Sequence, residues 1–293
     1  MIALPSSERL DVLSDWAESC VLFEGNSISR ATIESTLDDG GVYGAERMTD
    51  DIWQVIHMRH SMAGAGHPIE TSPVELKRTV DWKQCLAYAF QLLLVCQSHY
   101  EDLRQIGAPW LKASKMFEKL ATEALKVYLS GESINVGPPR EAPVPREFHK
   151  CVDHISAQTR EARGTRKQFS PHTQDEKLDV ICWRSFGDGR SGQVIILAQC
   201  AAGKDWTEKG PQLKTEVWQD LIDFAVEPIR ALAFPFVILS EEEWRYHCRQ
   251  AGVLLDRLRT ASLLASKPLP VQLESQLSDW CTKEIKRLPW SVL

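Results

Sequence analysis

DEKLDVICWRSFGDGRSGQVIILAQCAAGKDW, residues 175–206, is the stretch of sequence that decides the fold. Residues 180–182 and 194–198 are two apolar runs with the character of buried strands. The polar segment 187–192 joins them and supplies the Asp-Gly and Ser-Gly pairs that tight turns favour. The stretch therefore predicts two antiparallel strands connected by a short glycine-rich loop.

Polar residues stand at one end of this predicted hairpin. Asp179 comes directly before the first apolar run, and Gln199 follows the second. In an antiparallel hairpin of these lengths, both residues lie at the same end of the ribbon. An acid and an amide carbonyl with a lysine nearby form a set of hard ligands for a divalent cation, which suits cleavage of a phosphodiester. The same residues are also typical of strand caps and turns, so a purely structural role stays open.

The motif residues resemble the PD-(D/E)XK nuclease superfamily and, within it, the Mrr-type restriction endonucleases. That family carries Asp-x-Gly-apolar-Asp at its first catalytic strand and Gln-Cys-Lys at the next. Residues 175–179 read DEKLD and residues 199–201 read QCA. The resemblance implies that Asp179 and Gln199 match the metal-binding acid and amide of the family. It also implies that Glu118, within KMFEKL, supplies the acid of the family's first helix.

Two positions depart from the family pattern. Lys177 stands in place of the expected glycine, and Ala201 occupies the place of the catalytic lysine. Lys204 is the nearest replacement for that lysine, and Lys177 is the alternative. The resemblance thus implies a set of metal ligands for Mg²⁺ or Mn²⁺ and an overlapping catalytic set: Glu118, Asp179 and Gln199 for the metal, and Asp179, Gln199 and Lys204 for catalysis.

Three functions are compatible with these observations. The resemblance implies a magnesium-dependent deoxyribonuclease, a hydrolase acting in prokaryotic restriction or antiviral defence. The loss of the lysine at Ala201 favours instead a catalytically silent domain that binds nucleic acid or serves as a scaffold subunit of a defence complex. The third hypothesis is that the chain is an interaction protein with another α/β fold. In that case three tryptophans lie in its core or at an interface: Trp183, Trp206 and Trp218.

Composition narrows the class of protein. The chain has 293 residues, a net charge of −6 and 43% apolar residues, which is ordinary for a soluble globular protein. An acidic chain is not expected to coat DNA non-specifically, because phosphate neutralisation dominates such binding. No apolar run approaches 18 residues and no secretory signal opens the chain, so we expect a cytoplasmic protein without a membrane segment. The sequence is compatible both with an oligomer and with binding to a protein partner.

Two further sets of residues are candidate sites. The eight cysteines lack CxxC and zinc-finger spacing, which predicts free thiols. A basic cluster precedes the first catalytic strand and is either a DNA contact or a solvated helix end: Arg160, Arg163, Arg166 and Lys167.

The remaining pattern predicts a mixed α/β (α+β) protein in three parts. Residues 1–105 form a mainly helical N-terminal domain, with helices at 28–37, 50–60 and 82–100. Residues 106–270 form a restriction-endonuclease-like αβββαβ core. Residues 271–293 form a helical tail.

Within the expected core, helices are predicted at 115–129, 148–163, 213–224, 240–250 and 253–265. Strands are predicted at 134–136 and 231–239, in addition to the hairpin, with a proline-rich connector at 137–145. Pro235 indicates that the strand at 231–239 lies at a sheet edge or begins there.

Overall fold

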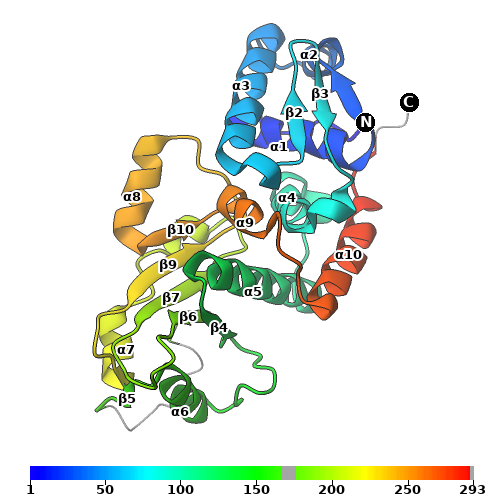
Figure 1. The fold of residues 1–293 in the computed structure, drawn as a ribbon. Coiled ribbons are helices and arrows are strands. Elements are labelled where there is room, and N and C mark those ends of the chain that lie inside the picture. The colour runs from blue at the N-terminus through cyan, green and yellow to red at the C-terminus, as the bar shows by residue number, and fades with distance from the viewer. Residues whose placement is uncertain (166–175, 291–293) are drawn as a thin grey trace. The chain divides into compact units, whose positions relative to one another are not determined.

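The computed structural model describes residues 1–165 and 176–290, and it contains two compact units (Figure 1). Unit 1 comprises residues 1–116, 235–240 and 256–293, and unit 2 comprises residues 117–234 and 241–255. The boundary expected near residue 105 thus falls eleven residues later, inside a helix. Residues of the expected tail belong to the same unit as the N-terminal helices. The protein has the mixed α and β composition that the sequence predicted.

Unit 1 is built mainly of α-helices, in agreement with the sequence pattern. Ser29 caps the second helix, where its side chain accepts a hydrogen bond from the backbone N–H of Thr32 at 3.1 Å. Gly40 ends that helix. The helices of this unit are α1 (Leu10–Phe23), α2 (Arg30–Asp39), α3 (Ala45–Ala63), α4 (Leu86–His99), α9 (Arg257–Leu264) and α10 (Val271–Ile285), with short 3₁₀ turns at Gly64–Gly66, Trp82–Cys85 and Glu101–Leu103.

Unit 1 also contains a small sheet that the sequence did not predict. Strands β1 (Ser27–Ser29), β2 (Ile69–Thr71) and β3 (Glu75–Arg78) pair antiparallel in the order β1-β3-β2. Each strand has three or four residues, too few to show a clear alternation of apolar and polar side chains. The expectation of a mainly helical region is therefore incomplete.

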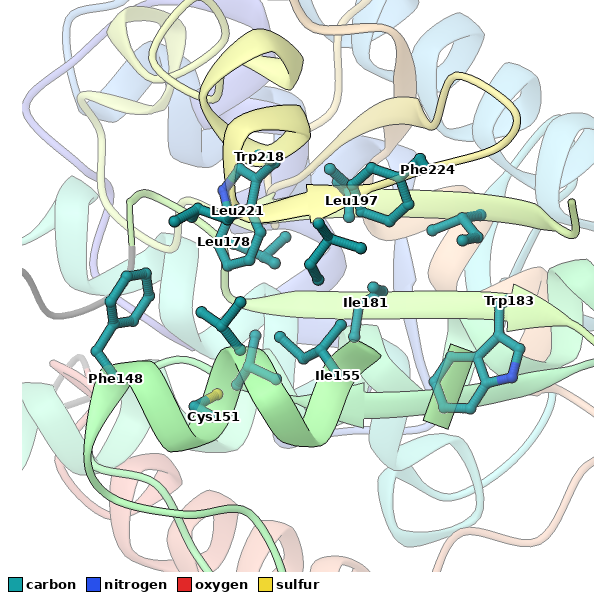
Figure 2. Close-up of a cluster of buried hydrophobic side chains, with 14 of the residues drawn as sticks. Phe148, Cys151, Ile155, Leu178, Ile181, Trp183, Leu197, Trp218, Leu221 and Phe224 are labelled. Atoms are coloured by element: carbon teal, nitrogen blue, oxygen red, sulfur yellow. The ribbon is translucent and has the colours of Figure 1, made fainter. Parts of the chain in front are cut away.

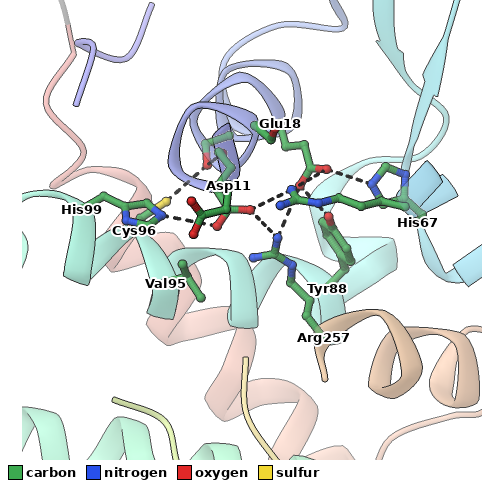
Figure 3. Close-up of polar contacts among 12 residues, drawn as sticks. Asp11, Glu18, His67, Tyr88, Val95, Cys96, His99 and Arg257 are labelled. Atoms are coloured by element: carbon green, nitrogen blue, oxygen red, sulfur yellow. Dashed lines mark hydrogen bonds and ion pairs between the residues drawn. The ribbon is translucent and has the colours of Figure 1, made fainter. Parts of the chain in front are cut away.

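A network of buried charges lies at the centre of unit 1 (Figure 3). Asp15 and Glu18 on α1 face two buried arginines, Arg59 on α3 and Arg257 on α9. Arg59 Nη1 lies 2.8 Å from Asp15 Oδ1 and 3.0 Å from Glu18 Oε1. Arg257 Nη2 contacts Asp15 Oδ1. Because two acids face two arginines, the cluster is balanced in charge, as a buried ionic group must be.

Uncharged and weakly basic side chains complete this network. His67 Nε2 lies 3.1 Å from Glu18 Oε1, and Tyr88 Oη donates to Glu18 Oε2 at 2.5 Å. His99 Nε2 lies 3.3 Å from Asp15 Oδ2. The network therefore connects α1, α3, α4 and α9 through side chains that are distant in sequence.

This network makes stability depend on pH. Burial by itself raises the pKa of Glu18, but the charge of Arg59 and the hydrogen bond from His67 outweigh it and lower the pKa from 4.5 to about 2. The folded protein thus binds fewer protons than the unfolded chain between these two values. The contribution of Glu18 is complete above about pH 4.5 and is lost as the pH falls toward about 2. We expect the midpoint of urea unfolding to fall through this window, and a Glu18→Gln variant to show a weaker acid dependence than the wild type.

Unit 2 contains a five-stranded mixed sheet. Its strands are β4 (Glu132–Asn135), β6 (Val180–Arg184), β7 (Val194–Cys200), β9 (Ile229–Ala233) and β10 (Val253–Leu255), in the spatial order β10-β9-β7-β6-β4. The pairs β4–β6 and β6–β7 are antiparallel, with Val180 opposite Ala198. The pairs β7–β9 and β9–β10 are parallel. The predicted hairpin is confirmed as β6 and β7, and the predicted short strand as β4.

The strands β6 and β7 bury side chains on both faces, which explains their continuous apolar runs. Figure 2 shows Ile181, Trp183 and Leu197 on the face that meets α6 (Phe148–Thr159) and α7 (Thr215–Leu221). Residues of the opposite parity face the helix α5 (Ala108–Leu129), where Cys182 Sγ donates to the carbonyl of Leu125 at 3.3 Å. The sheet of unit 2 is therefore the middle of three layers.

The other elements of unit 2 differ from the expectation in detail. The helix α6 ends at Thr159, because Arg160 has a left-handed backbone, and β5 (Ala162–Arg163) then pairs with β8 (Ile222–Asp223). The strand β9 ends before Pro235 and lies between β7 and β10, so its expected edge position is wrong. The start of the helix expected at 253–265 is instead the strand β10. The helix α8 (Glu241–Ala251) is present as expected.

Within the described ranges, no helix is long and apolar enough to cross a membrane. The eight cysteines are free. Five of them are buried (Cys20, Cys96, Cys151, Cys182 and Cys281) and three are half-buried (Cys85, Cys200 and Cys248).

Candidate functional site

Two carboxylates of unit 2 meet above Gly137. Glu118 lies on α5, Asp179 directly precedes β6, and Gly137 follows β4. A Cβ atom placed on Gly137 would lie 2.7 Å from Glu118 Oε2 and 2.8 Å from Asp179 Oδ1. The two oxygens are therefore separated by no more than the sum of these distances. A side chain at this position would crowd both carboxylates, so one or both of them would have to move.

Asn135 holds Glu118 in place. Its Nδ2 donates a hydrogen bond of 3.1 Å to Glu118 Oε2. Asn135 is the last residue of β4. In the sheet it lies opposite Val180, the residue that follows Asp179. The end of β4 thus brings Glu118, on α5, close to Asp179, which precedes β6.

Asp179 is held by its backbone and by its side chain. Its carbonyl accepts hydrogen bonds from the N–H groups of Val136 at 2.7 Å and Gly137 at 3.1 Å. Its Oδ2 accepts a hydrogen bond of 2.7 Å from the backbone N–H of Cys200. The other oxygen, Oδ1, is the one that approaches Gly137 and Glu118. Asp179 therefore ties the ends of β4 and β7 together and directs one oxygen to the carboxylate pair.

The hairpin has an irregularity at Asp179. The N–H of Asp179 donates to the carbonyl of Ala198 at 3.0 Å, although Ala198 is already the partner of Val180. Two residues on one strand facing one on the next is the arrangement of a β-bulge. A bulge interrupts the alternation of side chains, which explains how Asp179 reaches toward α5 while Ile181 faces the opposite layer.

Gln199 lies at the predicted end of the hairpin and is 6% exposed. Its Nε2 contacts Gln212 Oε1 at 3.5 Å, a distance at the limit for a hydrogen bond. Its Oε1 is buried and has no hydrogen-bond partner among the described residues. Gln199 has the same parity in β7 as Leu197, so its side chain lies on the face of the sheet that meets α6 and α7, away from Glu118 on α5.

The predicted lysines lie on the surface. Lys204 is exposed in the turn that follows β7 and makes no hydrogen bond or ion pair within residues 1–165 and 176–290. Lys177 is also exposed, and its backbone is left-handed, with φ of 66°. Ala201, at the position of the family's lysine, is 4% exposed.

Some of the predicted residues are outside the described part of the chain. Arg166 and Lys167 of the basic cluster fall there, as does Asp175 of the first motif. Of the cluster's other members, Arg163 pairs with Asp153 at 2.9 Å and donates to the carbonyl of Leu221 at 2.6 Å.

The sequence interpretation missed Asn135 and Gly137. The signal for both was present, since a polar Asn stood inside an otherwise apolar predicted strand and a Gly followed directly. Their role becomes visible only when β4 is paired with β6.

The donors of this site fit a hard cation in kind. The two carboxylates offer oxygen ligands, and Mg²⁺ is commonly held by one or two carboxylates together with waters and substrate phosphates. No group of three or more His, Cys, Asp or Glu side chains placed to hold a metal occurs among the described residues. A metal at the pair would therefore need ligands beyond Glu118 and Asp179, such as waters or the substrate.

Comparison of the chain with family models, with curated proteins and with solved structures found no match.

The crowding above Gly137 gives a testable consequence. We expect Gly137→Ala to weaken Mn²⁺ binding, since its methyl group would force apart the two carboxylates that are 2.7 and 2.8 Å away. We expect only a small change in stability, because both crowded atoms are ends of side chains that can shift. Calorimetric Mn²⁺ titration and urea unfolding measure the two effects. Gly25→Ala is the matched control, because its nearest contact would be an ordinary 3.4 Å. Mn²⁺ affinity equal to wild type in Gly137→Ala would contradict a metal site between these acids.

Proposed function

We propose that the protein is a metal-dependent endonuclease that cleaves DNA phosphodiester bonds. The observation that carries the proposal is the meeting of Glu118 and Asp179, which come from a helix and from the start of a central strand. Two carboxylates that face a common point can hold one divalent cation between them.

The order of elements in unit 2 also supports the proposal. The chain passes through α5, β4, β6, β7, α7 and β9, with α6 inserted between the first two strands. This is the helix, three-strand, helix, strand order of the αβββαβ nuclease core that the motifs resemble. The paired acids lie at the positions that this resemblance assigns to metal ligands.

The chain's own residues perform two tasks in this proposal. Asp179 Oδ1 and a Glu118 oxygen would hold the ion, and waters or the substrate phosphate would complete its coordination. Cys200 N–H and Asn135 Nδ2 fix the orientation of these carboxylates, through contacts of 2.7 and 3.1 Å. When bound, Mg²⁺ or Mn²⁺ would lower the pKa of a coordinated water molecule and would polarise the substrate phosphate. Restriction or antiviral defence in the cytoplasm, with a protein partner, is the setting that the resemblance implies.

A second candidate function rests on Ala201. A small buried residue at the place of the family's lysine favours a silent domain that binds nucleic acid or a protein without cutting. The two functions differ in whether the protein cleaves DNA at the carboxylate pair.

The test is nicking of supercoiled plasmid DNA by the full chain with Mg²⁺ or with Mn²⁺. The proposal expects nicking that requires the metal, disappears with EDTA and is lost in Glu118→Gln. Glu123→Gln, on the same helix, is the matched control and should cut as the wild type does. Plasmid that stays intact at every metal concentration would overturn the nuclease and favour the silent domain.

Lys204 is expected to supply the positive charge that Ala201 lacks. Because its side chain is exposed, Lys204→Ala should leave the melting temperature unchanged and slow nicking by about 100-fold, the effect of removing one charge-stabilising donor. Lys177→Ala tests the alternative lysine, and Lys214→Ala is the exposed control. Nicking at the wild-type rate in Lys204→Ala would exclude Lys204 from catalysis.

A further inference from the structure

A hollow of about 380 Å³ adjoins the carboxylate pair on the side of the edge strand β4. Asn135 belongs to both places, since it lines the hollow and donates to Glu118. The other walls come from β4, from the loop around Val144 and from His154 and Gln158 on α6. The floor includes Trp183, which is 2% exposed.

The size of the hollow suits one small ligand. Small-molecule sites span roughly 300–1,000 Å³, and this hollow lies near the lower limit. No other strand of the described sheet pairs with the outer edge of β4. A polymer can therefore run along this edge and place a single unit inside.

The charges around the hollow favour an uncharged unit. Glu132 and Glu141 line it together with one lysine, Lys119, whose Nζ is paired with Glu141 at 2.9 Å. Apart from His154, the ionisable side chains of the lining are these two acids and the paired lysine, so the hollow offers a phosphate no unpaired lysine or arginine. The same acids, with Ser133 and Gln158, can accept hydrogen bonds from amino groups.

We propose that this hollow binds one unpaired nucleobase of the DNA strand whose phosphate lies at Glu118 and Asp179, with a preference for bases that carry an exocyclic amino group. This inference rests on the proposed nuclease function and specifies its substrate as DNA with an unpaired or extruded base. Enzymes that act on an extruded base read it in a pocket by hydrogen bonds and apolar contact. Here Ile134 and Val144 supply the apolar contact.

Binding is measured separately from cleavage. Fluorescence anisotropy in Ca²⁺ compares equal-length single strands of oligo(dA), oligo(dC) and oligo(dT) with a duplex. We expect oligo(dA) and oligo(dC) to bind about tenfold more tightly than oligo(dT), the value of one additional hydrogen bond. We also expect the duplex to bind more weakly than the single strands. Equal affinity for all of these would overturn the proposal.

Two substitutions on α6 locate the binding. Gln158 is exposed and lines the hollow, so Gln158→Trp fills it without disturbing the core. Ala157 is the next residue, is also exposed and lies outside the lining, so Ala157→Trp is the matched control. Gln158→Trp should lose the preference for amino-bearing bases, while Ala157→Trp keeps it. Glu132→Gln should reduce the preference without filling the hollow. An unchanged preference in Gln158→Trp would place the base elsewhere.

The plasmid assay separates the two proposals. If the wild type nicks DNA but Gln158→Trp binds every strand as the wild type does, the hollow proposal falls and the nuclease stands. If no nicking occurs but Gln158→Trp abolishes the base preference, the nuclease falls and the hollow remains a nucleobase site.

Discussion

Replacing Asp179 with Asn is expected to lower metal-dependent DNA nicking by at least about 100-fold, the cost of removing one preorganised electrostatic group. The substitution keeps the shape of the side chain and an oxygen that can accept the 2.7 Å hydrogen bond from Cys200 N–H. It removes the negative charge beside Glu118. The loss of activity should therefore occur with the fold intact.

The same substitution should leave the melting temperature of the metal-free protein close to that of the wild type, because the amide keeps an acceptor for the Cys200 N–H. A loss of activity without a loss of stability separates a carboxylate that acts in the reaction from one that only holds the fold. A purely structural Asp179 would leave the nicking rate unchanged.

Two comparisons complete this experiment. Asp179→Ala should lose activity and also lose stability, because it removes the acceptor of the Cys200 N–H. Asp188→Asn is the matched control, since Asp188 accepts a backbone hydrogen bond of 3.1 Å from Arg190 in the loop at the other end of the hairpin. Asp188→Asn should nick DNA as the wild type does. Nicking by Asp179→Asn at the rate of that control would contradict the role of Asp179.

The hairpin was predictable because its signals are local. The apolar runs of β6 and β7 and the glycine-rich loop between them lie within about thirty consecutive residues, and the alternation of buried faces leaves few alternatives. Asp179 and Gln199 were accordingly placed at one end of the hairpin. The resemblance named Glu118 as a further metal ligand, and Glu118 and Asp179 both approach Gly137 in the structure.

What could not be predicted depends on contacts distant in sequence. The bulge at Asp179 is a detail of strand pairing and has no sequence signal of its own, yet it determines which face the carboxylate reaches. The strand β10 has three residues and was read as the start of a helix, because pairing with β9 outweighs local propensity. The role of Asn135 likewise requires β4 and α5 together.

Replacing Asp15 with Asn is expected to cost about 3–5 kcal/mol of unfolding free energy, the typical effect of breaking a buried ion pair from one side. Asp15 is 4% exposed and contacts both Arg59 and Arg257. Without its charge, these two arginines share the single acid Glu18. Urea unfolding near pH 7 measures the loss.

The control lies one turn away on the same helix. Asp11 also pairs with an arginine, Arg9, at 2.7 Å, but the side chain of Arg9 is 74% exposed. Asp11→Asn should therefore change the unfolding free energy by about 0–1 kcal/mol. Equal losses in the Asp11 and Asp15 variants would show that burial does not set the strength of these pairs.

A double variant separates two effects on the free energy of unfolding: the contribution of the buried ion pairs, and the cost of leaving one buried charge unpaired. Removing Asp15 and Arg257 together leaves Glu18 and Arg59, whose side chains are 3.0 Å apart and balanced in charge. We expect Asp15→Leu with Arg257→Met to lose at least about 1 kcal/mol less than the two single variants combined. Strictly additive losses would mean that each side chain stabilises unit 1 through its own packing, and that the network is not a unit.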